Sequence, residues 1–290
     1  MNLNVDQRSP DKGAARIDFG ALVEAAARRS RRRRLKILTA QMGAAVLLVA
    51  AWQVTAEFWM DPFWISSPDR VANQIVELAV SGDLWRHTLA TLKAAGLGFL
   101  LGASAGLVTG FVLGRIEALR RIFQPFVMAG YVVPKVALAP LFILWFGLGM
   151  PSKIALTALI TYFLIFLAIL EGVRSVDPDY VALVKFYGAS RRQVFQSVIL
   201  PATAPWLLSG VRISLPFALT GAIVAEFVAA SEGLGYYMRQ SAAFVNTAGI
   251  FAGVIVLAVL GLSANALLEK AHKVLLPWRE SEAKGLGVPP

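Results

Sequence analysis

The chain of 290 residues contains no cysteine and only two histidines. The absence of cysteine excludes disulfide bonds, thiolate nucleophiles and metal sites built on cysteine ligands. His87 and His272 lie far apart, beside different apolar runs, so we expect neither a metal cluster nor a Ser–His–Asp arrangement. The glycine-rich loop that holds ATP phosphates, ending in Gly-Lys-Ser/Thr, is also missing. If ATP powers this protein, another chain must bind it.

Charged residues are scarce as well. They make up 16% of the chain, whereas a soluble domain carries roughly 25%. Hydrophobic residues account for 57%, and the mean hydropathy is +0.63. The net charge is +10, and the basic side chains gather at the ends of apolar runs. This pattern indicates a membrane protein that contacts anionic lipid headgroups, and it argues against nucleic acid as a partner.

Six apolar runs are long enough to cross a bilayer, which takes about 20 helical residues. We therefore expect an all-α polytopic membrane protein with six transmembrane helices. The first run is too long for a cleaved signal peptide, so we expect it to be a retained anchor. Pro134 and Pro140 predict an irregular third span, which is tolerated where backbone lines a cavity. The runs cover residues 35–58, 91–113, 123–146, 154–170, 206–228 and 248–268.

Lysine and arginine concentrate on one side of these runs: before the first, between the second and third, between the fourth and fifth, and after the sixth. The positive-inside rule then places both termini in the cytoplasm. A short amphipathic helix is expected over residues 69–81 on the other side. The predicted organisation is a basic cytoplasmic tail (1–34), the first span (35–58), a periplasmic loop with the amphipathic helix (59–90), a transmembrane core (91–270) that contains a polar cytoplasmic segment (171–205), and a cytoplasmic tail (271–290).

The second run carries five glycines at steps of four, which form one stripe down a helix. Small residues allow helices to approach closely in lipid. The stripe favours packing against another helix of the same chain over a seam between two chains. The glycines are Gly98, Gly102, Gly106, Gly110 and Gly114.

The polar segment 171–205 reads as two short helices around a glycine. Asp177 is a helix N-cap and Pro178 suits the first helical position, so a helix is predicted to about Tyr187. Gly188 supplies the left-handed residue that ends it. Ser190 and Gln193, three residues apart, match a capping box that begins a second helix.

The second helix is predicted to end at Ile199 or Leu200, with Pro201 breaking it. The first helix carries Tyr180, Val184, Phe186 and Tyr187 beside Lys185. Large apolar residues on a cytosolic element suggest a contact surface for a partner. Packing onto the protein's own membrane helices explains them equally well from the pattern alone.

The run from Gly188 to Val198-Ile-Leu-Pro201 resembles the EAA loop of ABC importer permeases, the MetI-like binding-protein-dependent inner-membrane components. Residues 133–149, 172–177, 210–213 and 225–236 resemble the nitrate, sulfonate and taurine branch of that family. The resemblance covers about residues 66–268 in the right order. One departure stands out: the family's Glu-Ala-Ala triplet falls on Ala182-Leu183-Val184, so its acidic residue is missing.

The resemblance implies the core of a type I ABC importer permease in a bacterial inner membrane. Two copies would form the path, two cytoplasmic ABC ATPase subunits would bind ATP and Mg²⁺, and a periplasmic binding protein would deliver the solute. The chain itself would hold no cofactor and catalyse no reaction. The short helix would insert into a cleft of the ATPase. The coupling residues implied are Asp177, Tyr180, Val184, Lys185, Phe186, Tyr187, Gly188, Ala189, Ser190, Arg191 and Pro201.

Three charged residues lie inside the apolar runs: Lys135, Arg212 and Glu226. Such charges cost about 2.5–3.5 kcal/mol on insertion scales and usually face a cavity or a partner. Lys135 and Arg212 could line a path that favours anions. A structural pair of Lys135 with Glu226, or Arg212 reaching to the membrane surface, are the alternatives.

We therefore expect the permease subunit of an ATP-driven importer for a small anionic solute, such as a sulfonate, taurine, nitrate or a small organic acid. A secondary transporter or channel for a small anion is the alternative, but the inverted repeats common in that class are not evident. A membrane-embedded enzyme would need nucleophiles, metal ligands or paired carboxylates that the spans lack. The binding protein largely selects the solute in such systems, so the chain alone does not name it.

Overall fold

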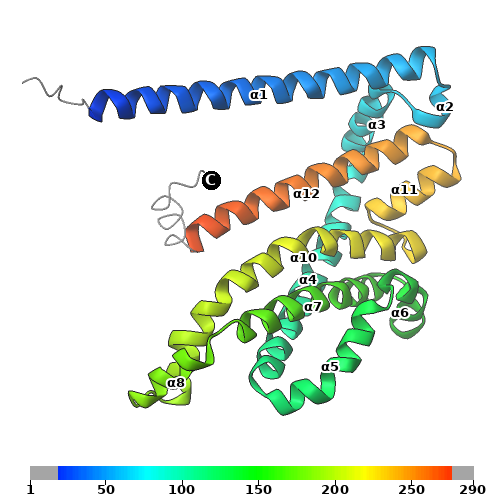
Figure 1. Ribbon diagram of the computed structural model, residues 1–290. Coiled ribbons are helices and arrows are strands. Elements are labelled where there is room, and N and C mark those ends of the chain that lie inside the picture. The colour runs from blue at the N-terminus through cyan, green and yellow to red at the C-terminus, as the bar shows by residue number, and fades with distance from the viewer. Residues whose placement is uncertain (1–18, 276–290) are drawn as a thin grey trace, which may run out of the picture. The chain divides into compact units, whose positions relative to one another are not determined.

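The computed structural model describes residues 19–275, and all regular structure in that range is helical (Figure 1). Residues 1–18 of the predicted basic tail and 276–290 of the predicted C-terminal tail lie outside the described part. The elements are α1 (Phe19–Phe58), α2 (Pro62–Ile65), α3 (Pro68–Ser81), α4 (Asp83–Arg115), α5 (Glu117–Val132), a 3-10 turn (Lys135–Leu138), α6 (Ala139–Phe146), α7 (Met150–Arg174), α8 (Pro178–Phe186), α9 (Arg191–Val194), a π-helical turn (Phe195–Ile199), α10 (Leu200–Ala229), α11 (Leu234–Ala243) and α12 (Thr247–Leu275).

The chain divides into two compact units between Trp59 and Met60. The first unit holds α1, whose stretch Leu35–Phe58 is long and apolar enough to cross a membrane. This stretch has the bounds predicted for the first span. The second unit holds every other helix and is described below by itself.

Five helices are long and apolar enough to span a membrane, and a sixth span results if one bent pair is counted as a single crossing. In that pair, Glu117–Val132 and Lys135–Phe146 meet at 86°. The break falls at Pro134, which has no backbone N–H to continue the helix. The irregular third span is thereby confirmed, and the predicted number of six spans is reached if the bent pair crosses the membrane once. The spans after the first are Asp83–Arg115, the bent pair, Met150–Arg174, Arg191–Val228 and Thr247–Lys270.

The helix α7 contacts both α4 and α10, which also contact each other (Figure 1). The glycine stripe of α4 faces α7 so closely that side chains would not fit. A Cβ on Gly106 would lie 2.7 Å from the carbonyl oxygen of Tyr162, and one on Gly114 would lie 2.8 Å from the Cβ of Val173. The stripe therefore packs within one chain, as predicted.

The shorter helices of the second unit also match local sequence signals. The predicted amphipathic helix over residues 69–81 is α3, which buries Val71 and Leu78. The helix α11 follows the turn at Gly233 and contacts α10 and α12. At this end of the unit, the amide of Asn246 donates to the side chain of Gln74 at 3.1 Å and so links the start of α12 to α3.

The prediction that Pro201 breaks the second polar helix is wrong. The span Arg191–Val228 is continuous, with Pro201 in the first turn of α10. A π-helical turn, Phe195–Ile199, precedes the proline, and the backbone N–H of Leu200 donates to the carbonyl of Phe195. The wider turn redirects the backbone hydrogen bonds just before the residue that lacks an N–H, so the helix axis continues.

Candidate functional site

The first polar helix begins and ends as its residue types dictate. The Asp177 carboxylate accepts a hydrogen bond from the backbone N–H of Asp179 at 2.9 Å, and Pro178 occupies the first turn of α8. The helix ends at Phe186, one residue before the predicted end. Gly188 then adopts φ +87°, a left-handed conformation that glycine takes without steric cost. The predicted helix–glycine–helix arrangement is confirmed.

A capping box starts α9. The backbone N–H of Gln193 donates to the Ser190 hydroxyl at 3.3 Å, and the backbone N–H of Ser190 donates to the Gln193 side chain at 2.8 Å. Two backbone donors that would otherwise lack partners are satisfied reciprocally. The loop between α8 and α9 is therefore held in one geometry by its own residues.

The two faces of α8 have different roles. Val181 and Val184 pack against the apolar core cluster formed by α7, α9 and the π-turn, and Ala189 does so just beyond the helix. Phe186 and Tyr187 point away from that core, with 86% and 81% of their surface exposed. Their rings meet edge to face at 6.0 Å.

Packing onto the protein's own helices is confirmed for one of these apolar residues, and a contact surface for a partner stays a prediction for the others. Val184 anchors α8 to the membrane core, whereas Tyr180, Phe186 and Tyr187 are displayed to the outside. The basic residues Lys185 and Arg191 are exposed as well, and neither forms an ion pair with any of the described side chains. The end of the unit that carries α8 thus presents aromatic rings and unpaired cations on a fixed platform.

The three intramembrane charges lie in three different environments. Lys135 follows the 86° break and lies over the rings of Tyr131 and Phe163, with its Nζ 4.7 and 4.8 Å from their centroids. It also donates to the carbonyl of Tyr131. Arg212 on α10 pairs with Glu269 on α12 at 3.4 Å, and both side chains are largely exposed.

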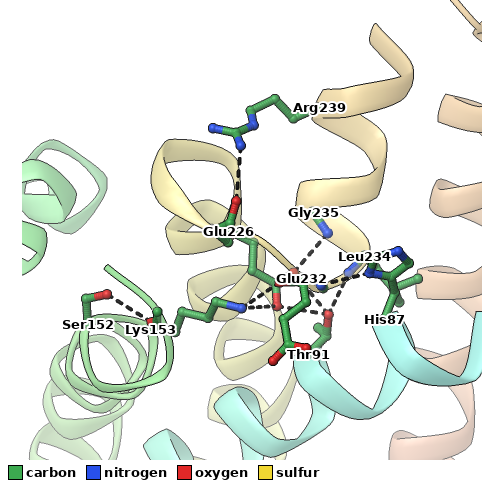
Figure 2. Close-up of polar contacts among 12 residues, drawn as sticks. His87, Thr91, Ser152, Lys153, Glu226, Glu232, Leu234, Gly235 and Arg239 are labelled. Carbon is green, nitrogen blue, oxygen red and sulfur yellow. Dashed lines mark hydrogen bonds and ion pairs between the residues drawn. The ribbon is translucent and has the colours of Figure 1, made fainter. Parts of the chain in front are cut away.

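Glu226, the third charge, is fully buried near the end of α10 (Figure 2). Its carboxylate lies 3.5 Å from the ammonium of Lys153 on α7 and accepts hydrogen bonds from the Thr91 hydroxyl at 3.0 Å. The backbone N–H of Gly235 donates to it at 2.9 Å. The suggested structural pair of Lys135 with Glu226 is therefore wrong, because Lys153 is the partner.

The same cluster fastens the segment that leads into α11 (Figure 2). Lys153 donates to the carbonyl of Glu232 at 2.6 Å, and the backbone N–H of Leu234 donates to Thr91 at 2.9 Å. The backbone N–H of Gly233 donates to Nδ1 of His87, a buried side chain on α4. Three membrane helices and one connecting segment thus share a single set of polar contacts, which we call the buried polar cluster.

Gly233 is required for this arrangement. Its φ is +121°, and a Cβ there would overlap the Glu226 carboxyl group. Nearby, the guanidinium of Arg239 donates to the carbonyls of Phe227, Val228 and Ala230, which lie at the C-terminal end of α10. A cation at a helix C-terminus satisfies carbonyls that have no helical partner.

Sequence reasoning identified Glu226 but missed Lys153, Thr91 and His87. Nothing in the local pattern around Lys153 connects it to its partner Glu226 on another span. Across residues 19–275, no group of three histidine or carboxylate side chains is placed to hold a metal ion.

The sequence was compared with known protein families and with individual proteins. Residues 98–278 match the family model described as "Binding-protein-dependent transport system inner membrane component". The chain is 33% identical over 237 residues to the formylaminopyrimidine transport permease protein ThiX of Halalkalibacterium halodurans, a match that covers 82% of this chain and 94% of the relative. It is 31% identical to the taurine transport system permease protein TauC of Escherichia coli, with 81% and 87% covered.

The fold is similar to a chain of the MetNI methionine ABC transporter in an inward-facing conformation. The TM-score is 0.53 at 18% sequence identity, and the match covers 66% of this chain and 95% of that one. At this identity the likeness concerns the fold alone. With the family match spanning more than half of the sequence, the chain belongs to the binding-protein-dependent transport system inner membrane components, as a multi-pass permease of the MetI type.

Proposed function

We propose that this chain forms the translocation path of an ATP-driven importer, with α8 as the element that transmits the movement of an ATPase subunit. Two copies of the chain would enclose the path, two ATPase subunits would bind to the α8 helices, and a binding protein would deliver the solute at the α3 and α11 end. In this proposal α8 and both termini face the cytoplasm. The single observation that carries it is the exposed aromatic end of a helix whose other face is fixed to the core.

The exposed rings at the end of α8 are suited to contact with a partner protein. Phe186 and Tyr187 together form an apolar patch at the tip of α8, in a part of the chain that lies beyond the ends of the membrane spans. Aromatic residues in this setting are typical of protein contact sites. Because Val181 and Val184 fix α8 to the core, a force applied at the tip reaches the membrane helices without first deforming the loop.

The solute is proposed to be small and negatively charged. Lys135 supports this, because it lies at the break of the third span and is unpaired with any carboxylate among the described residues. Broken helices are common at the substrate sites of transporters. Arg212 and Glu226 already have ion-pair partners, so Lys135 is the better candidate for contact with the solute. The relatives are named for different solutes, a formylaminopyrimidine and taurine, and they leave the choice within this class open.

The α8 contact is tested by affinity purification of the tagged full-length chain from its native membrane. The readout is the amount of ABC ATPase subunit that copurifies, identified by mass spectrometry and by ATP hydrolysis in the eluate. Phe186→Ala is expected to reduce this amount by roughly tenfold or more, because buried aromatic anchors in interfaces contribute about 2 kcal/mol or more.

Phe244→Ala is the matched control, since it removes an aromatic ring of similar exposure, 76%, at the opposite end of the unit. It should leave copurification unchanged. The proposal fails if the two variants behave alike, or if no ATPase subunit copurifies with the unaltered chain.

A further inference from the structure

A groove of about 980 Å³ lies beside the inner face of α8, between the last turn of α4 and the start of α9. Its walls are mainly apolar and include Phe111, Val112, Phe195 and Ile199. Small-molecule sites usually measure roughly 300–1,000 Å³, so the groove is large enough for a headgroup with the upper part of a hydrocarbon chain. The aromatic tip of α8, which we assigned to the ATPase contact, is not part of it.

Three cations line the groove: Arg115, Lys185 and Arg191. None of the described residues that line it is acidic, and none of the three cations forms an ion pair with a side chain that the structure describes. The guanidinium of Arg115 lies over the ring of Phe195, 5.1 Å from its centroid, and is thereby held at the wall. The groove therefore carries uncompensated positive charge beside an apolar surface.

The cations lie at one end of the groove and the apolar wall continues from them, in the same order as the headgroup and the acyl chain of a lipid. Arg115 is the last residue of the candidate span Asp83–Arg115 and Arg191 the first of the candidate span Arg191–Val228, so both cations lie at helix ends and outside the apolar middle of the spans. Phe111 lies one helical turn from Arg115 toward the middle of the span, about 6 Å deeper. Moving along the groove from the cations to Phe111 thus leads from a charged helix end toward the apolar middle of a candidate span.

We propose that this groove is a binding site for an anionic phospholipid of the adjacent leaflet. Its phosphate would lie among Arg115, Lys185 and Arg191, and the upper part of an acyl chain would lie along the wall at Phe111 and Val112. An acidic segment of a partner protein would satisfy the cations but not the apolar wall inside the span. Free phosphate would leave that wall exposed. A lipid satisfies both parts, so it is the occupant that the groove favours.

The test is native mass spectrometry of the full-length chain in detergent. The chain is titrated with phosphatidylglycerol, with phosphatidylcholine of the same acyl chains, or with glycerol 3-phosphate. The first phosphatidylglycerol is expected to bind roughly tenfold or more tightly than the first phosphatidylcholine, because each nearby cation favours anionic lipid. Glycerol 3-phosphate should not displace it, since it lacks the chain that the apolar wall would hold.

The double variant Arg115→Gln with Arg191→Gln is expected to reduce this preference to about twofold or less. The matched control is Arg121→Gln with Arg192→Gln, which removes two charges from exposed neighbours that do not line the groove. The control should keep the preference. Arg115→Gln alone, at an exposed residue outside the proposed ATPase contact, should lower it part of the way.

Four outcomes would overturn the proposal. They are equal binding of the two lipids by the unaltered chain, an equal loss of preference in the control variant, displacement of the lipid by glycerol 3-phosphate, and displacement of the lipid by the copurified ATPase subunit. The last outcome would assign the groove to the ATPase contact. None of these readouts depends on transport. The lipid-binding proposal can therefore be refuted while the proposed transport function still holds.

Discussion

The two ends of the second unit differ in the burial of the charged groups described above. At the α11 end, Glu226 and Lys153 are fully buried, and the backbone between Glu232 and Gly235 is bonded to them and to Thr91 and His87. At the α8 end, aromatic rings and basic side chains are exposed. The buried polar cluster is held by contacts within the chain, whereas the aromatic and basic groups of the α8 end remain exposed.

Because of this difference, we expect substitutions at the α11 end to lower the free energy of unfolding and substitutions at the α8 end to affect the binding of partners. Removing a buried group leaves its partners without compensation and lowers the free energy of unfolding. Removing an exposed group at the α8 end changes little within the chain, so its effect should appear only when an ATPase or a lipid is present. The following experiments test this contrast, beginning with the largest expected effect.

Lys153→Met should be the most destabilising change, because it leaves the Glu226 carboxylate buried without a counterion. We expect a loss of about 3–5 kcal/mol, seen as a large fall in the thermal unfolding midpoint or in folded yield in detergent. Adding Glu226→Gln should restore much of the stability, since the neutral amide needs no counterion. A Lys153→Met variant as stable as the parent would contradict the importance of the pair.

Gly106→Val should separate α4 from α7, because the new side chain would overlap the backbone of Tyr162. We expect a loss of about 1–3 kcal/mol in the free energy of unfolding, measured by denaturation in detergent. Gly96→Val on the same helix is the control, since nothing lies within 4 Å of a Cβ there. Equal effects of the two substitutions would show that the stripe is not a packing seam.

Gly188→Ala places a side chain on a residue with φ +87° and should cost about 1–2 kcal/mol locally. Gly82→Ala imposes a similar strain at φ +82° between α3 and α4, again in open space. Only Gly188→Ala should weaken ATPase copurification. Combining Lys185→Glu with Gly188→Pro should abolish transport-coupled ATP hydrolysis, and normal ATPase stimulation in that variant would refute the assignment of α8.

Ser190→Ala removes one half of the capping box and should have the smallest effect, about 1 kcal/mol. We expect faster amide hydrogen exchange at Gln193 and its neighbours, with an unchanged global unfolding midpoint. If exchange at the start of α9 does not change, the cap does not hold the loop.

Features set by neighbouring residues could be predicted from the sequence. The Asp177 cap, the left-handed Gly188 and the Ser190 capping box each depend on contacts a few residues apart, and the structure confirms all three. The break at Pro134 follows in the same way from the missing N–H. The five long apolar helices and the bent pair could be predicted because hydrophobic length is a property of each segment alone.

Features that depend on distant partners could not be predicted. Thr91 and Glu226 are 135 positions apart, and no local pattern joins them. Pro201 was expected to end a helix because it lacks a backbone N–H, but a π-turn precedes it and the helix continues. Ile199 in that turn shares a core cluster with Ile169 of α7, a contact that no local pattern shows. The two faces of α8 could be assigned only once the core beneath Val181 and Val184 was known.

The π-turn that keeps α9 and α10 continuous has a mechanical consequence. The span Arg191–Val228 is one hydrogen-bonded helix of 38 residues, roughly 57 Å long. It begins at the exposed α8 end, contacts α7 along its course, and carries Glu226 at the other end. A tilt of this helix about its contact with α7 would move its two ends in opposite directions, so a displacement at Arg191 would reach Glu226 and act on the contacts that join α10 to α4, α7 and the segment leading into α11.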